Sequence, residues 1–114
     1  MNGCNNNPSS QDISPQQLQE QISSTSPPFV IDVRSGFEYR SNHIPGAAHM
    51  PFWSLPWSKS ALPENSPLVL YCEHGPRAYL AGWILSLSSS QPIFYLQGHM
   101  QGWRKLGLPV EVAP

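Results

Sequence analysis

The stretch VLYCEHGPRAYLAGWIL (69–85) joins two apolar segments through a short polar turn, and a cysteine lies where the first segment stops. Its first three residues are typical of the end of a strand, and Ala78 onward is typical of a helix. The turn between them consists of Cys72, Glu73, His74, Gly75, Pro76 and Arg77. Strand, turn and helix in this order are the building unit of a parallel α/β sheet, which binds ligands at the carboxyl ends of its strands.

Helices alternate with apolar strands along the rest of the chain. The expected strands cover residues 29–33, 47–50, 67–71 and 92–96. The expected helical segments cover residues 15–23, 35–42, 78–87 and 98–107. Ser14 and Gln17 have the spacing of a capping box, Ser35 is a second N-cap, and Gly107 suits a helix C-terminus. Prolines interrupt residues 53–66, so we expect a loop there with at most one helical turn.

Four tryptophans divide into two groups. Trp83 and Trp103 fall on expected helices and are predicted to lie in the core. The helix around Trp83 is apolar nearly all round, so we expect the protein to enclose it. Trp53 and Trp57 share a proline-rich loop, and two interpretations remain open: an aromatic rim beside a site, or a cover over the core.

The chain length, the net charge and the composition restrict the class of protein. With 114 residues we expect one domain, over residues 11–114, after a disordered Asn- and Ser-rich tail at residues 1–10. The net charge is -1 without a run of basic residues, which argues against nucleic acid as a partner. No basic residue precedes Arg34 and no apolar stretch is long enough for a membrane span, so neither a secretory signal nor membrane insertion is expected. We expect a monomeric cytoplasmic protein with free thiols, since two cysteines make no disulfide framework.

Cys72 lies where such a sheet has its active site, after a strand and before a helix. The backbone N–H groups of the turn can converge as an anion nest, and the positive end of the helix dipole is directed at the same point. Arg77 adds a cation about one turn into the helix. All three features favour the thiolate over the thiol and predict a reactive cysteine. The alternative is a buried structural cysteine, against which the loop position, the glycine and the arginine argue.

Three segments resemble those of rhodanese-like sulfurtransferases. They are the Cys72-x4-Arg77 loop, VIDVRSGFEYRSNHIPGAAHMPF (30–52) and YLQGHMQGWRKLGLPV (95–110). The latter two are similar to the family's Asp-Val-Arg…Glu-Tyr…His-Ile-Pro-Gly-Ala and Leu-x-Gly-Gly…Trp…Gly-Leu-Pro segments, in the family's order. The resemblance implies a rhodanese-like three-layer α/β fold, with a mostly parallel five-stranded sheet and helices on both faces.

The resemblance also implies sulfur transfer without a metal or an organic cofactor. Cys72 is then the nucleophile that takes sulfur from a small donor, thiosulfate or a persulfide, and passes it from a Cys72 persulfide to a thiol or protein acceptor. Arg77 belongs to the catalytic loop. The implied substrate-binding residues are Glu73, His74, Gly75, Pro76 and Asp32. Arg34 and Glu38 resemble a structural ion pair that braces the neighbouring turn.

The sequence departs from the family at three places. Pro76 lacks the backbone N–H usual there; either one donor to the sulfur anion is lost, or Pro76 is merely the first helical residue, where its N–H would be spare. Glu73 puts an anion at the pocket mouth, so we expect weak thiosulfate turnover and a neutral or protein-borne donor. Gly98 and His99 stand at a turn where Gly-Gly is usual.

Other functions agree less well with the sequence than sulfur transfer does. Phosphatases of the same fold use a Cys-x5-Arg loop, one residue longer, so phosphatase chemistry is not expected. The cysteine and histidine spacing matches no structural zinc pattern. His74 is either a local acid or base, or a residue that faces water. The alternative function is a catalytically weak domain for binding or regulation, or a persulfide sensor. Cys72 and Arg77 favour the enzyme, whereas Pro76 and Glu73 favour the alternative.

Overall fold

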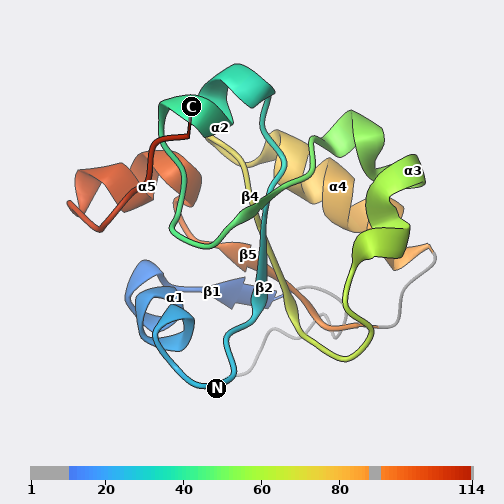
Figure 1. Ribbon diagram of the computed structural model, residues 1–114, viewed down its shortest axis with the longest axis horizontal. Coiled ribbons are helices and arrows are strands. Elements are labelled where there is room, and N and C mark those ends of the chain that lie inside the picture. Colours follow the sequence, from blue (N-terminus) through green and yellow to red (C-terminus); the bar gives the residue numbers. More distant parts are fainter. Residues whose placement is uncertain (1–10, 88–90, 114) are drawn as a thin grey trace.

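Five parallel strands form one sheet in the order β1-β5-β4-β2-β3 in the computed structural model, which describes residues 11–87 and 91–113 (Figure 1). The strands are β1 (Gln11–Ile13), β2 (Phe29–Asp32), β3 (Ala48–His49), β4 (Leu68–Tyr71) and β5 (Ile93–Leu96). Because every pairing is parallel, all carboxyl ends lie at one edge of the sheet. β4 is the central strand, so Cys72, which follows it, lies in the middle of that edge. The predicted disorder of residues 1–10 falls outside the described residues.

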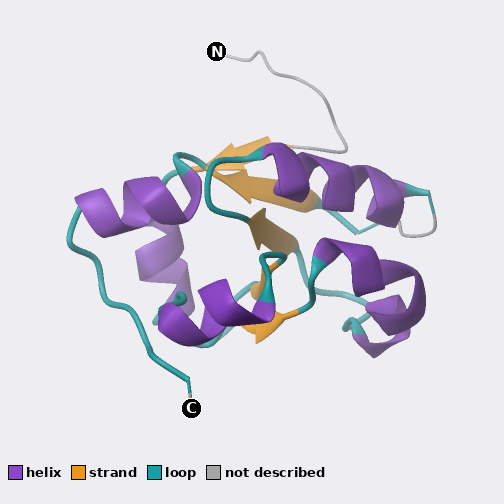
Figure 2. Ribbon diagram, turned by 90° about the horizontal axis from the view of Figure 1, so that it is seen from above, coloured by secondary structure: helices purple, strands orange, loops and turns teal. Residues whose placement is uncertain are grey.

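Helices cover both faces of the sheet, as the view from above shows (Figure 2). They are α1 (Pro15–Ile22), α2 (Gly36–Ser41), α3 (Leu55–Ser58), α4 (Pro76–Ser86) and α5 (His99–Lys105), with 3-10 helices η1 (Phe52–Ser54) and η2 (Lys59–Ala61). Side chains alternate between the faces of a strand, so β4 contributes to two cores. Leu68 and Leu70 pack with α3 and α4 on one face, and Val69 and Tyr71 pack with α1 and α5 on the other.

Local sequence signals account for most element boundaries. The Ser14–Gln17 capping box is present at the start of α1, and an equivalent box joins Ser35 to Glu38 at the start of α2. Gly107 takes the left-handed conformation, with φ of 70°, directly after α5 and its C-cap residue. Trp103 is fully buried, which confirms its predicted core position.

The segment predicted as a loop with at most one helical turn, residues 53–66, is more helical than expected. η1, α3 and η2 follow one another without a break. Pro51 precedes η1 as its N-cap residue, and Pro56 lies in the first turn of α3. Proline in a first turn removes no intrahelical hydrogen bond, so these prolines start helices instead of ending them. Trp53 and Trp57 are exposed, so the interpretation that both cover the core is wrong.

The prediction that the protein encloses α4 is also wrong. The helix buries only its small face, Ala78, Ala81, Gly82 and Leu85. The opposite face is open: Trp83 is 62% exposed, so it is not a core residue, and Leu80 is exposed as well. α4 packs against one face of the sheet, so the sheet covers only one side of the helix. The apolar residues on the opposite side remain exposed to solvent. Within residues 11–87 and 91–113, no helix combines the length and the apolar composition needed to cross a membrane.

Gly82 permits the close approach of α4 to β5. The Tyr95 hydroxyl lies where a Cβ at position 82 would be. We therefore expect Gly82→Ala to lower the free energy of unfolding by about 1–3 kcal/mol, the usual effect of overpacking a core. Urea unfolding followed by circular dichroism measures this change.

Gly102→Ala in α5 is the matched control. A Cβ there would meet only the Gln97 carbonyl oxygen, at 3.7 Å, which is ordinary contact. We expect this control to be stabilised by up to about 1 kcal/mol, because alanine favours helix over glycine. Equal effects of the two substitutions would show that the Tyr95 contact does not limit position 82.

Candidate active site

Cys72 is a fully buried free cysteine at the carboxyl end of the central strand. The Gly75 backbone N–H donates a hydrogen bond to its Sγ, with 2.8 Å between nitrogen and sulfur. α4 begins at the next residue, so the positive end of its dipole lies at the same turn. A donor N–H and a helix N-terminus are both groups that can interact favourably with negative charge on a sulfur atom at this position.

Gly75 is the residue that lets the loop turn back onto the sulfur. Its φ of 132° is a conformation that residues with a Cβ rarely adopt. A Cβ there would also lie 3.2 Å from both the His99 ring and the Tyr79 ring. Pro76 follows as the first residue of α4, as one of the two interpretations of this proline predicted.

The start of α5 is hydrogen-bonded to the backbone of the loop. The Met100 N–H donates to the Cys72 carbonyl at 2.9 Å, and the Gln101 N–H donates to the Glu73 carbonyl at 3.3 Å. In the opposite direction, the Cys72 N–H donates to His99 Nδ1 at 3.3 Å. Both backbone polar groups of the cysteine are thereby satisfied by one short helix.

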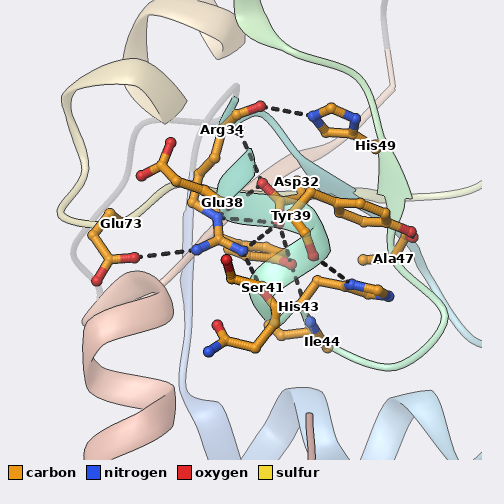
Figure 3. Close-up of polar contacts among 12 residues, drawn as sticks. Asp32, Arg34, Glu38, Tyr39, Ser41, His43, Ile44, Ala47, His49 and Glu73 are labelled. Atoms are coloured by element: carbon orange, nitrogen blue, oxygen red, sulfur yellow. Dashed lines mark hydrogen bonds and ion pairs between the residues drawn. The ribbon is translucent and has the colours of Figure 1, made fainter. Parts of the chain in front are cut away.

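Asp32 lies under the loop as a buried carboxylate at the end of β2 (Figure 3). It accepts hydrogen bonds from the Arg34 guanidinium, at 2.8 Å from Nη2, and from the Arg34 backbone N–H. The Tyr71 hydroxyl donates to the same carboxylate at 2.8 Å. Burial and the nearby Asp32 charge raise the pKa of Tyr71, so this hydroxyl remains a donor. The hydrogen bonds of Asp32 thus go to other groups of the protein, and they connect the end of β2 to Tyr71, the residue directly before Cys72.

Glu73 is paired with two arginines. Its carboxylate binds Arg104 of α5 and lies 3.2 Å from Arg34 Nη1. The hydrogen bond from Arg104 and the charges of both arginines outweigh the opposing effect of burial and hold the pKa of Glu73 below its usual range. Glu73 was expected to present an anion at the pocket mouth, whereas its charge is compensated by arginines from α5 and from the residues just after β2.

Arg77 is paired with Glu38, and this overturns the predicted Arg34–Glu38 pair. Two hydrogen bonds join the Arg77 guanidinium to the Glu38 carboxylate, at 2.6 and 3.0 Å. The bond from Arg77, together with those from Ser35, lowers the pKa of Glu38 to about 2. Since Glu38 also closes the capping box of α2, one carboxylate connects the beginnings of α2 and α4.

The histidines other than His99 make ordinary hydrogen bonds with partners outside the Cys72 turn. His74 is exposed and its Nδ1 lies 3.0 Å from the Gln101 side chain, in line with a loop histidine that faces water. His43 Nδ1 lies 2.9 Å from the Tyr39 carbonyl oxygen, and His49 Nε2 lies 2.8 Å from the Arg34 carbonyl oxygen. Among the described residues, no three His, Cys, Asp or Glu side chains form a group that could hold a metal ion.

The sequence did not reveal four partners of the loop: Arg34 and Arg104 for Glu73, Glu38 for Arg77, and His99 for Cys72. Each lies 27 or more positions away in the chain, and only the fold brings it near. One signal was available, because His99 stands where glycine is usual in the family that the sequence resembles.

Comparison with known proteins gives a consistent result. A family model described as rhodanese-like domain matches residues 14–106. A sulfurtransferase of Allochromatium vinosum is 29% identical over 103 residues, which are 90% of this chain and 95% of that relative. The thiosulfate sulfurtransferase GlpE of Haemophilus influenzae is 25% identical and covers the same shares of the two chains. The crystal structure of a rhodanese-related protein from Thermoplasma volcanium matches with a TM-score of 0.80 and 27% identity, over 90% of this chain and 98% of that one.

Glu38→Gln tests the ion pair that connects α2 and α4. Glutamine can still close the capping box, so the substitution removes the charge and keeps the cap. We expect a loss of about 1 kcal/mol in the free energy of unfolding near neutral pH, the upper range for a partly exposed pair. Urea unfolding at several pH values measures it.

The difference in the free energy of unfolding between wild type and Glu38→Gln should decrease as the pH falls. The pKa of Glu38 is lowered from its ordinary value of 4.5 to about 2, so its stabilising effect is present above pH 4.5 and is lost as pH falls toward 2. The gap between wild type and Glu38→Gln should shrink by about half between about pH 5 and about pH 3. The exposed Glu20→Gln is the control and should change stability little. A gap that stays constant with pH would contradict the assignment.

Proposed function

Because the chain belongs to the rhodanese-like domain family, we propose that it is a sulfurtransferase that carries sulfane sulfur as a Cys72 persulfide. The observation that carries the proposal is the Gly75 N–H on Cys72 Sγ, at the carboxyl end of the central strand. The start of α4 adds its dipole at the same place. Relatives named as sulfurtransferases support the same activity at modest identity.

In the first step, the Cys72 thiolate attacks the outer sulfur of the donor. A bond forms between Cys72 Sγ and that sulfur while the donor's sulfur–sulfur bond breaks. The leaving group takes the electron pair: sulfite when the donor is thiosulfate, a thiolate when the donor is an organic persulfide. The negative charge then lies on the outer sulfur of the Cys72 persulfide, at the turn where backbone N–H groups and the α4 dipole can stabilise it.

In the second step, a thiolate of a small molecule or of a protein attacks the outer sulfur of the Cys72 persulfide. The acceptor gains the sulfur and becomes a persulfide, and Cys72 leaves as a thiolate. The two displacements require no metal and no organic cofactor, and they predict ping-pong kinetics. The proposed partners are therefore a small sulfur donor and a thiol or protein acceptor.

The paired carboxylates bear on the choice of donor. Glu73 was expected to repel thiosulfate, but two arginines compensate its charge. Glu38 is likewise compensated by Arg77. The electrostatic reason for weak thiosulfate turnover is therefore much reduced, and we propose that thiosulfate and small organic persulfides both serve as donors.

The burial of Cys72 favours the alternative function, a catalytically weak domain used for binding, regulation or persulfide sensing. No part of the cysteine is exposed, so a donor reaches Sγ only when surrounding groups move. A structural cysteine would be covered in the same way. The enzyme and a purely binding or regulatory domain differ in one measurable property, which is whether a small donor loads sulfur onto Cys72.

Intact mass spectrometry after treatment with a donor tests the proposed function. The reduced protein is incubated with thiosulfate, and separately with a small organic persulfide. We expect a gain of about 32 Da, one sulfur, that Cys72→Ser does not show. Cys4→Ser is the matched control and should still gain the sulfur. If neither donor adds mass to the wild type, the binding or regulatory function replaces the enzyme.

Pro76→Ala asks whether the missing N–H matters to the sulfur. Proline at the first helical position removes no intrahelical bond, and Gly75 already supplies a donor to Sγ. We expect the rate of sulfur loading to change by less than about twofold, below the effect of one typical hydrogen bond to a charged group. A rise of tenfold or more would mean that an N–H at position 76 binds the sulfur and that proline weakens the natural site.

A further inference from the structure

His99 holds an unusual position at the start of α5. It is 96% buried by residue area, with 4% exposed, and its φ of 53° lies in the left-handed region. That conformation is unfavourable for a residue with a side chain of this size. A glycine would adopt this conformation freely. Contacts of the histidine ring that glycine could not make must therefore compensate for the unfavourable backbone conformation.

The ring contacts the loop at two points. Nδ1 accepts the Cys72 backbone N–H at 3.3 Å, so Nδ1 carries no proton and the neutral ring has its proton on Nε2. Nε2 lies beside Gly75, because a Cβ built there would be 3.2 Å from it. His99 thus touches the residue that carries the thiol and the residue whose N–H binds the sulfur.

We propose that neutral His99 is a positioning residue that fixes the Cys72 backbone, and that protonation of Nδ1 releases it. A protonated Nδ1 is a donor and would face the Cys72 N–H, another donor, so the hydrogen bond is lost. The consequence for sulfur transfer rests on the proposed function; the loss of the hydrogen bond does not.

The surroundings keep the ring neutral at ordinary pH. Burial lowers the pKa of His99, and the nearby His74 on the loop lowers it further. Asp12 of β1 acts in the opposite direction. The phenol ring of Tyr79 also stands edge-on to the His99 ring, with 5.7 Å between the ring centroids. The acidic form should therefore become populated only below about pH 6.5, the ordinary value for histidine.

Nuclear magnetic resonance of the ¹⁵N-labelled protein tests the hydrogen bond directly. We expect the Cys72 amide signal to shift in a single step below about pH 6.5, together with the His99 ring signals. His99→Asn should lack the step, because asparagine tolerates left-handed geometry and its amide oxygen accepts a hydrogen bond but does not titrate. His99→Gly should fold without backbone strain and also lack the step. His74→Asn is the control and should keep it, at slightly higher pH.

A second measurement follows sulfur loading of Cys72 against pH. Relative to His99→Asn, the wild type should slow by about two- to tenfold as pH falls through the amide step, the size expected for one hydrogen bond. A Cys72 amide that does not titrate with His99, or identical pH profiles of wild type and His99→Asn, would overturn the inference. An amide step without sulfur loading in any variant would leave the role of His99 standing and refute the proposed function.

Discussion

The buried carboxylate of Asp32 is the constraint on which the loop depends. A charge without exposed area is costly unless it is paired and hydrogen-bonded. Arg34 provides most of the partners, and Tyr71 provides one more. Tyr71 directly precedes Cys72, and Arg34 also binds Glu73, which directly follows it. Neutralising one charge therefore fixes the chain on both sides of the cysteine.

Local signals in the sequence predicted most of the fold. The largely apolar run at residues 29–33, the capping box at Ser14 and the alternation of strands with helices were sufficient to predict a parallel α/β sheet. β1 was missed because an edge strand of three residues has no apolar pattern of its own. The exposure of Trp83 was missed because composition shows that a helix is apolar but not how much of its surface the sheet can cover.

The candidate site could be predicted in part for the same physical reason. Cys72 and Gly75 belong to one continuous turn, so their proximity follows from the sequence. The partners of the charged loop residues do not, since Glu38 and Arg104 come from other elements. Counting charges within the loop left Glu73 as an uncompensated anion, and only the packed structure reveals its two arginines. Sequence reasoning thus placed the cysteine in its loop more easily than it revealed the charges around it.

The separation of these partners along the chain has a consequence for folding kinetics. Arg34 binds Glu73, and Glu38 binds Arg77, each across 39 positions, and Cys72 reaches His99 across 27. Contacts of such high sequence separation form late, after the loops between them have closed. During synthesis on the ribosome, the thiol loop thus has no fixed shape until α5 has emerged. For that interval the nascent Cys72 lacks the hydrogen bonds with α5 that hold its backbone in the folded protein.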